Sequence, residues 1–141
     1  MLQDTLNMKG HLAIAINDEV VQEVPNLVVT SGKGYVASRM KDGTANAMSH
    51  MAIGTGSSAA AAANTALGSE ADRNSLTSTT VSGGTVTYVA TFDAGEGTGA
   101  ITEAGLLNAS SGGTMLCRTV FAVVNKGAQD SMTITWSVTV S

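Results

Sequence analysis

Two stretches near the C-terminal end of the sequence alternate between apolar residues and residues that are mostly threonine or serine. Every second residue of 85–92 is apolar, and the same is true of 133–140. A period of two places successive side chains on opposite faces of an extended strand, whereas a helix would scatter them around its axis. The chain must therefore contain half-buried β-strands that have an apolar inner face and a hydroxyl-bearing outer face.

Further strand patterns fill much of the remaining sequence. Residues 12–24 predict a hairpin around a polar turn, residues 50–53 predict a short strand, and 100–108 and 114–124 predict two more. Short polar turns with no helix between them are typical of antiparallel sheets. About seven or eight strands predict an all-β fold, an antiparallel β-sandwich of the jelly-roll-like kind.

A single short helix is expected, over residues 30–42. Thr30 and Ser31 can cap its first turn, and a glycine follows its expected end. Gly32 and Gly34 each cost about 1 kcal/mol relative to alanine in a helix interior. Packing against the rest of the protein must therefore hold this helix in place.

The length of 141 residues suits one domain. We expect an N-terminal arm over residues 1–10, where isolated apolar residues lack a period, and a single β-sandwich domain over residues 11–141. The alanine-rich stretch 57–73 is expected to be a long surface loop with at most one helical turn. Cys117 is the single cysteine, so it cannot form a bridge within the chain, and we expect a buried, inert thiol.

Charged residues are scarce, at 13% of the sequence against about 25% in an ordinary soluble domain. The net charge is −4 and there is no basic cluster, so we expect no nucleic-acid partner. No apolar run approaches the roughly 18 residues of a membrane span, and the first residues lack the positive region of a secretory signal. We expect no membrane partner either. A neutral surface of this kind is poorly defended against association with other proteins.

Residue types that perform catalysis or bind metals are few and scattered. His11 and His50 are the only histidines and lie in separate segments, without an HxxxH or CxxC pattern. Asp93 and Glu96 occupy a glycine-rich turn but lack the spacing of a calcium-binding loop. We therefore expect no enzymatic activity, no catalytic residues, no metal and no cofactor.

Glu103 is the acidic residue that most needs a partner. It lies inside the predicted strand 101–107, where an acid is unfavourable unless it is paired. Arg118 in the following strand is one candidate partner, and Arg73 is another. We expect a structural ion pair that fixes the strand register, because a catalytic carboxylate would need a second acid and a cleft.

Four short segments resemble, in their order along the chain, a domain of virion proteins from tailed bacteriophages. They are Ala52–Gly56, Thr65–Glu70 with Arg73, Ile101–Leu107 and Leu116–Phe121. The resemblance spans roughly Met51 to Ser141. This domain occurs in tail-fibre or collar proteins and in small capsid cement (decoration) proteins. A separate copy of this length is more similar to the cement proteins, which implies a jelly-roll-like β fold that is paired as a dimer outside the shell.

The resemblance implies a structural virion protein, made in the cytoplasm of a bacterial host. It would bind the capsid exterior as a homodimer and cement neighbouring subunits of the major capsid protein. The alternative is a tail-fibre or collar adaptor, or a receptor-binding module of a phage tail. We expect contacts through the arm, through methionines that could instead be ordinary core, and through a free sheet edge that could take a partner strand. The candidate interface residues are Leu2, Leu6, Met8, Met40, Met48 and Met51.

Overall fold

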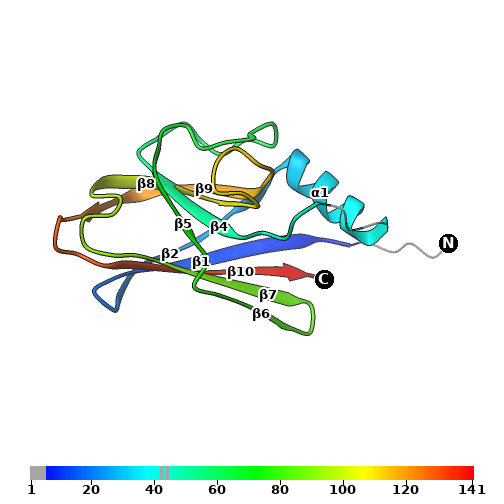
Figure 1. Cartoon of the computed structure of the whole chain (residues 1–141), viewed down its shortest axis with the longest axis horizontal. Coiled ribbons are helices and arrows are strands. Elements are labelled where there is room, and N and C mark those ends of the chain that lie inside the picture. Colours follow the sequence, from blue (N-terminus) through cyan, green and yellow to red (C-terminus); the bar gives the residue numbers. More distant parts are fainter. Residues whose placement is uncertain (1–5, 42, 44) are drawn as a thin grey trace.

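The computed structural model describes residues 6–41, 43 and 45–141. Its elements are β1 (Met8–Ile16), β2 (Glu19–Pro25), β3 (Leu27–Val28), α1 (Thr30–Lys41), β4 (His50–Gly54), β5 (Glu70–Ser75), β6 (Ser78–Ser82), β7 (Thr85–Phe92), β8 (Gly99–Leu107), β9 (Met115–Lys126) and β10 (Met132–Val140). The strands form two five-stranded antiparallel sheets, with strand orders β2-β1-β10-β7-β6 and β3-β9-β8-β4-β5. Figure 1 shows the sheets as two layers, with the helix at one end. The predicted all-β sandwich with one short helix is confirmed.

The alternating stretches form β7 and β10, which pair with each other in the interior of one sheet. Trp136 lies opposite Tyr88, and both side chains point into the core. On the outer face the hydroxyl oxygens of Thr85 and Thr139 are 2.9 Å apart, and two further hydroxyl pairs connect the same strands. The alternation therefore divides the sheet into an apolar inner face and a hydroxyl-lined outer face, as predicted.

The main core lies between the two layers. It contains the largest buried apolar side chains of both sheets, among them Trp136, Phe92 and Met51. A second, smaller cluster consists of Val29, Ala52, Leu67, Leu107 and Met115. Because Leu67 belongs to the long loop between β4 and β5, this smaller cluster anchors that loop to β4, β8 and β9.

Helix α1 lies within the predicted range 30–42, although residue 42 is outside the described residues. A Cβ atom on Gly32 would lie 2.1 Å from the carbonyl oxygen of Leu116 in β9. The hydroxyl of Ser31 donates a hydrogen bond of 3.3 Å to the carbonyl oxygen of Met115. The glycine that weakens the helix therefore permits close contact with β9, and packing holds the helix as expected.

The sequence patterns did not reveal three of the strands, so the prediction of seven or eight was too low. Strands β5 and β6 lie at sheet edges, and neither has an alternating burial pattern, while β3 has only two residues. Strand β5 also begins inside the stretch 57–73 that was predicted to be loop. The arm prediction was wrong for residues 8–10, because β1 begins at Met8 and pairs there with β10.

The two ends of the described chain lie side by side. Asn7 and Ser141 exchange two backbone hydrogen bonds of 2.8 and 2.9 Å, and Met8 pairs with Val140. Both ends are on the same side of the molecule in Figure 1. The helix among the described residues is too short and polar to cross a membrane.

Candidate functional site

The carboxylate of Glu103 accepts five hydrogen bonds, from a neighbouring loop and from Arg118. Its side chain points from β8 toward the loop between β4 and β5 and is fully buried. It accepts hydrogen bonds from the backbone N–H groups of Gly56 (2.7 Å), Gly68 (2.8 Å) and Ser69 (2.7 Å). One carboxylate therefore binds both ends of a loop that has little regular structure of its own.

Arg118 in β9 supplies the countercharge. Its Nε and Nη2 atoms lie 3.1 and 2.9 Å from Oε1 of Glu103, and its side chain is only 2% exposed. The remaining guanidinium donors reach the middle of the same loop, at the side-chain oxygen of Asn64 (2.9 Å) and the carbonyl oxygens of Ser58 (3.1 Å) and Ala59 (3.5 Å). The ion pair is thus the centre of a network that fastens the loop to the sheet.

Strand register explains why Glu103 and Arg118 meet. Gly105 is the residue opposite Arg118 in the β8–β9 pairing, so Glu103 is a diagonal neighbour of Arg118 on the same face. Diagonal neighbours are within reach of long side chains. Of the two candidate partners for Glu103, the structure selects Arg118.

Arg73 forms a separate ion pair. Its Nη2 and Nε atoms donate to the two carboxylate oxygens of Glu70 at 2.7 and 3.0 Å. Its Nη1 atom donates to the carbonyl oxygens of Ala109 and Gly112 at 3.0 and 2.9 Å. Arg73 therefore connects the edge strand β5 to the turn between β8 and β9, and it takes no part in the Glu103 cluster.

Gly56, the last residue of the segment Ala52–Gly56, has a steric role. A Cβ atom on Gly56 would lie 2.4 Å from Oε2 of Glu103, so only glycine lets the backbone approach the carboxylate. The hydroxyl of Thr102 donates a hydrogen bond of 2.7 Å to the Gly56 carbonyl oxygen on the other side. We define the Glu103 cluster as Glu103, Arg118, Gly56, Gly68 and Ser69.

Electrostatics keep Glu103 ionised. Burial alone would raise the pKa of its carboxyl group, but the hydrogen bonds from Ser69, Gly68, Arg118 and Gly56 outweigh burial, and the pKa lies below its ordinary value of 4.5. Both carboxylate oxygens are occupied by protein donors. The arrangement can hold a loop in place, but it offers no free acid to a substrate.

The sequence-predicted interface residues divide into exposed and buried sets. Leu6 and Met40 are 71% and 79% exposed, and Met8 is partly buried. Together with Val36 of α1 they line a groove of about 370 Å³, to which Asn7, Lys33 and Ala37 also contribute. We call this the β1–α1 groove. Leu2 lies outside the described residues.

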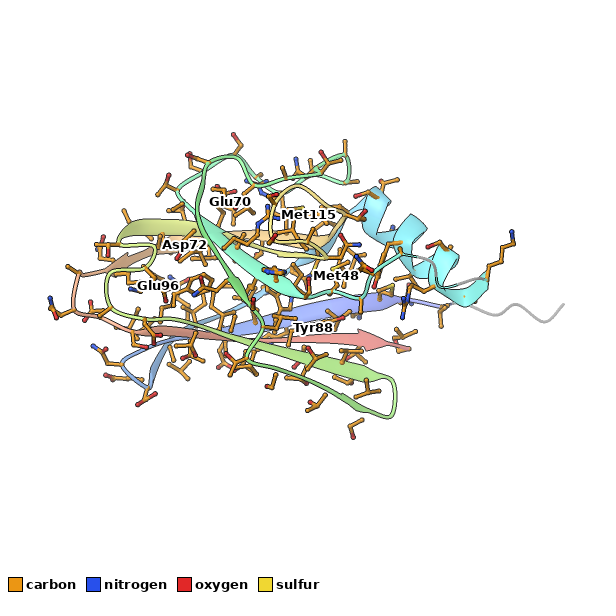
Figure 2. The ribbon with its side chains drawn as sticks, viewed as in Figure 1. Met48, Glu70, Asp72, Tyr88, Glu96 and Met115 are labelled. Carbon is orange, nitrogen blue, oxygen red and sulfur yellow. The ribbon has the colours of Figure 1, made fainter. Side chains whose placement is uncertain are left out.

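The prediction was wrong for Met48 and Met51, which belong to the core. Met48 is 6% exposed and Met51 is fully buried. Met51 lies on β4, which has a neighbouring strand on each side, and Figure 2 shows Met48 between the two layers. Neither side chain is therefore available to a partner protein.

The other residues considered from the sequence are dispersed. His11 lies on β1 and His50 on β4, in different sheets. Oε1 of Glu96 accepts hydrogen bonds from the backbone of Asp93 (2.8 Å) and the side chain of Asn74 (3.2 Å), which closes the turn. Cys117 is fully buried, as predicted, and burial raises the pKa of its thiol. In the part of the chain that the structure describes, no three His, Cys, Asp or Glu side chains gather as a metal site.

Sequence reasoning missed the contribution of the loop. Asn64 accepts from Arg118 and also from the backbone N–H of Ala61 at 2.8 Å, so it connects the ion pair to the loop's own turn. The only signal in the sequence was an asparagine that interrupts a run of small residues. Such a signal does not indicate a partner that lies 54 residues further along the chain.

No protein-family model, curated protein or solved structure matches this chain. The four segments that carry the resemblance all meet at the Glu103 cluster, because Gly56, Ser69, Glu103 and Arg118 each belong to a different one.

Proposed function

We propose that this chain is a structural protein without enzymatic activity. The observation that carries the proposal is the convergence of the resembling segments at the Glu103 cluster. Gly56, Ser69 and Arg118 come from three of these segments and all bind Glu103, which comes from the fourth. A buried acid whose oxygens are fully occupied by a neighbouring loop and by Arg118 supports an architectural role for the motifs, which is the role that a virion protein requires.

Within that class we propose a capsid cement protein of a tailed bacteriophage. It would bind the outside of the assembled shell and connect neighbouring subunits of the major capsid protein. A protein that binds only the assembled shell stabilises it by mass action, and a homodimer that grips two subunits gains avidity from the second contact. The proposal includes synthesis in the host cytoplasm and no cofactor.

The β1–α1 groove is the proposed contact with the capsid. Its exposed apolar side chains, Leu6 and Met40, are the kind that adapt to a partner surface. Lys33 adds a positive charge at the same place, which suits an acidic rim on the capsid side. The scarcity of charge elsewhere supports a crowded assembly, because interface cores are depleted of charged residues.

Copy number in purified virions distinguishes the cement role from the tail role. We expect the molar ratio of this protein to the major capsid protein to be within a small factor of one, measured by quantitative mass spectrometry of whole particles. An adaptor, collar or receptor-binding component would be present in tens of copies or fewer. Such a low ratio would overturn the cement assignment in favour of the tail alternative.

Binding to purified shells tests the groove. The variant Leu6→Asp/Met40→Asp should lose shell binding in a co-sedimentation assay while its melting temperature stays unchanged, because both side chains are exposed. The matched control is Val20→Asp, an exposed valine at the other end of β1 and β2, which should bind normally. Normal binding by the groove variant would exclude this surface.

A further inference from the structure

The two sheets together have four edge strands, namely β2, β6, β3 and β5. An edge strand leaves a row of backbone N–H and C=O groups free to pair with another strand, and proteins protect such edges with charges, proline or short length. Strand β2 carries Glu19, Glu23 and Pro25. Strand β5 carries charged residues at three of its six positions, and β3 has only two residues.

Strand β6 carries neither a charge nor a proline, and its five residues are enough to pair with another strand. Its sequence is Ser-Thr-Thr-Val-Ser and every residue is exposed. The sequence from Asn74 to Phe92 contains neither a charged residue nor a proline. Val81 is 71% exposed, and Figure 1 shows β6 at the outer margin of its sheet, beyond β7. Among the four edges, β6 is the one suited to accept a further strand.

The sequence of β6 is nearly the same in both directions. Serine stands at each end, and three β-branched residues lie between them. When two such strands pair antiparallel, each serine lies opposite a serine, and each β-branched residue lies opposite another β-branched residue. No like charges face each other, whereas self-pairing of β2 about its centre would bring Glu19 and Glu23 of the two copies close as diagonal neighbours. The edge is therefore complementary to a second copy of itself.

We propose that β6 is a dimer interface, at which two copies of the chain pair antiparallel about a two-fold axis at Thr80. In this register Thr80 lies opposite Thr80, Ser78 opposite Ser82, and Thr79 opposite Val81. The two five-stranded sheets join into one continuous sheet. The exposed side of Val81 is partly covered, and the hydroxyl-lined outer face extends across the junction. In a two-fold interface both copies contribute the same surface, so this surface must be complementary to itself.

The interface is small, so its affinity in solution is modest. A five-residue strand pair buries less than the roughly 800 Å² per partner of a standard interface, and we expect a dimer dissociation constant in the micromolar range. The β6 pairing would be the contact between the two copies of the proposed cement dimer. On a capsid the local concentration of these copies is high, which favours a weak contact. The β6 pairing rests on the proposed function only for its place on a capsid, since the β6 edge is present in the free protein.

Sedimentation velocity tests the edge. The wild-type protein should show reversible monomer–dimer exchange between about 1 µM and 1 mM. Val81→Lys should raise the dimer dissociation constant at least about tenfold, because two lysines would point along the shared edge. The control Val20→Lys replaces a valine that is 57% exposed on edge strand β2, and it should leave the dimer dissociation constant unchanged. A wild-type protein that stays monomeric, or a Val81→Lys variant that dimerises like wild type, would overturn the proposal.

Disulfide trapping tests the register. In Thr80→Cys the two introduced residues face each other with Cα atoms about 4.5–5.5 Å apart, which is within the range of a disulfide. In the control Ser78→Cys the two introduced cysteines are offset by four residues along the paired strands, so their Cα atoms are about 13 Å apart. Mild oxidation should trap the first variant as a dimer and leave the second a monomer. Equal trapping of both variants would contradict the register.

The two proposals fail in different experiments. A protein that dimerises through β6 but is present in tens of copies or fewer per virion would overturn the cement function and leave the β6 interface in place. A monomeric protein that is abundant on shells would overturn the β6 interface and leave the cement function in place.

Discussion

Glu103 shows how a single side chain can organise a segment that has no regular structure. Its carboxylate joins the two ends of the loop between β4 and β5 and binds Arg118, whose other donors reach the loop's middle. A buried ion pair gains little over a well-packed apolar pair, but the loss of one member leaves a buried charge without compensation. The loop therefore depends on both charges being present.

Replacement of Glu103 by alanine should lower the free energy of unfolding by about 3–5 kcal/mol. The reason is that Arg118 stays buried and three loop N–H groups lose their acceptor. Urea denaturation followed by circular dichroism measures this loss. The control Glu70→Ala should lose several-fold less, because the Glu70 side chain is 34% exposed and Arg73 keeps two carbonyl acceptors. A loss under about 0.5 kcal/mol for Glu103→Ala would show that the cluster contributes little.

The low pKa of Glu103 sets the direction of a pH effect. Below pH 4.5, the ordinary value, the unfolded chain takes up a proton at this carboxyl more readily than the folded chain does. Its contribution to stability is therefore complete above pH 4.5 and is lost as the pH falls through the lower folded pKa. The difference in unfolding free energy between wild type and Glu103→Gln should be constant from pH 7 to 5 and shrink toward pH 3. A difference that grows on acidification would contradict this assignment.

At the scale of one element, helix α1 contains two glycines that differ in their surroundings. A Cβ on Gly32 would collide with the backbone of Leu116, whereas a Cβ on Gly34 would have no atom within 4 Å. The first glycine is thus required by packing against β9, and the second only weakens the helix.

The two alanine substitutions should have opposite effects. Gly34→Ala should raise the free energy of unfolding by about 0.5–1 kcal/mol, because the folded conformation is helical and the unfolded chain loses freedom. Gly32→Ala should lower it by more than 1 kcal/mol, since β9 must move or the helix must detach. Thermal unfolding of the two variants and of the wild type measures both changes in stability. Similar effects of the same sign would mean that α1 does not pack on β9 as described.

The elements that could be predicted from sequence are those with one face toward solvent and one face toward the core. Strands β7 and β10 are flanked on both sides in their sheet and covered by the other layer, so burial alternates along them. Strand β6 is exposed throughout and has no such period. Met51 was misassigned because an exposed and a buried methionine look alike in sequence. The pairing of Glu103 with Arg118 was foreseeable from adjacent strands, but its three loop donors lie 34 to 47 residues away.

At the scale of the whole molecule, the low charge has a structural explanation. The outer face of the sheet that contains β7 and β10 is covered by hydroxyl groups that hydrogen-bond to each other across strands. These groups satisfy one another and need few charged neighbours. Two of the edges are protected by charge and one by its length, which leaves β6 as the neutral edge.

The pairing of β1 with β10 also dictates the order in which the molecule can form. Both strands are interior members of one sheet, yet Met8 meets Val140 from the opposite end of the chain. During synthesis β1 must wait, with one side unpaired, until β10 leaves the ribosome. Such distant contacts make folding slow, on the order of milliseconds to seconds, so the protein completes its sandwich only after translation has passed its last strand.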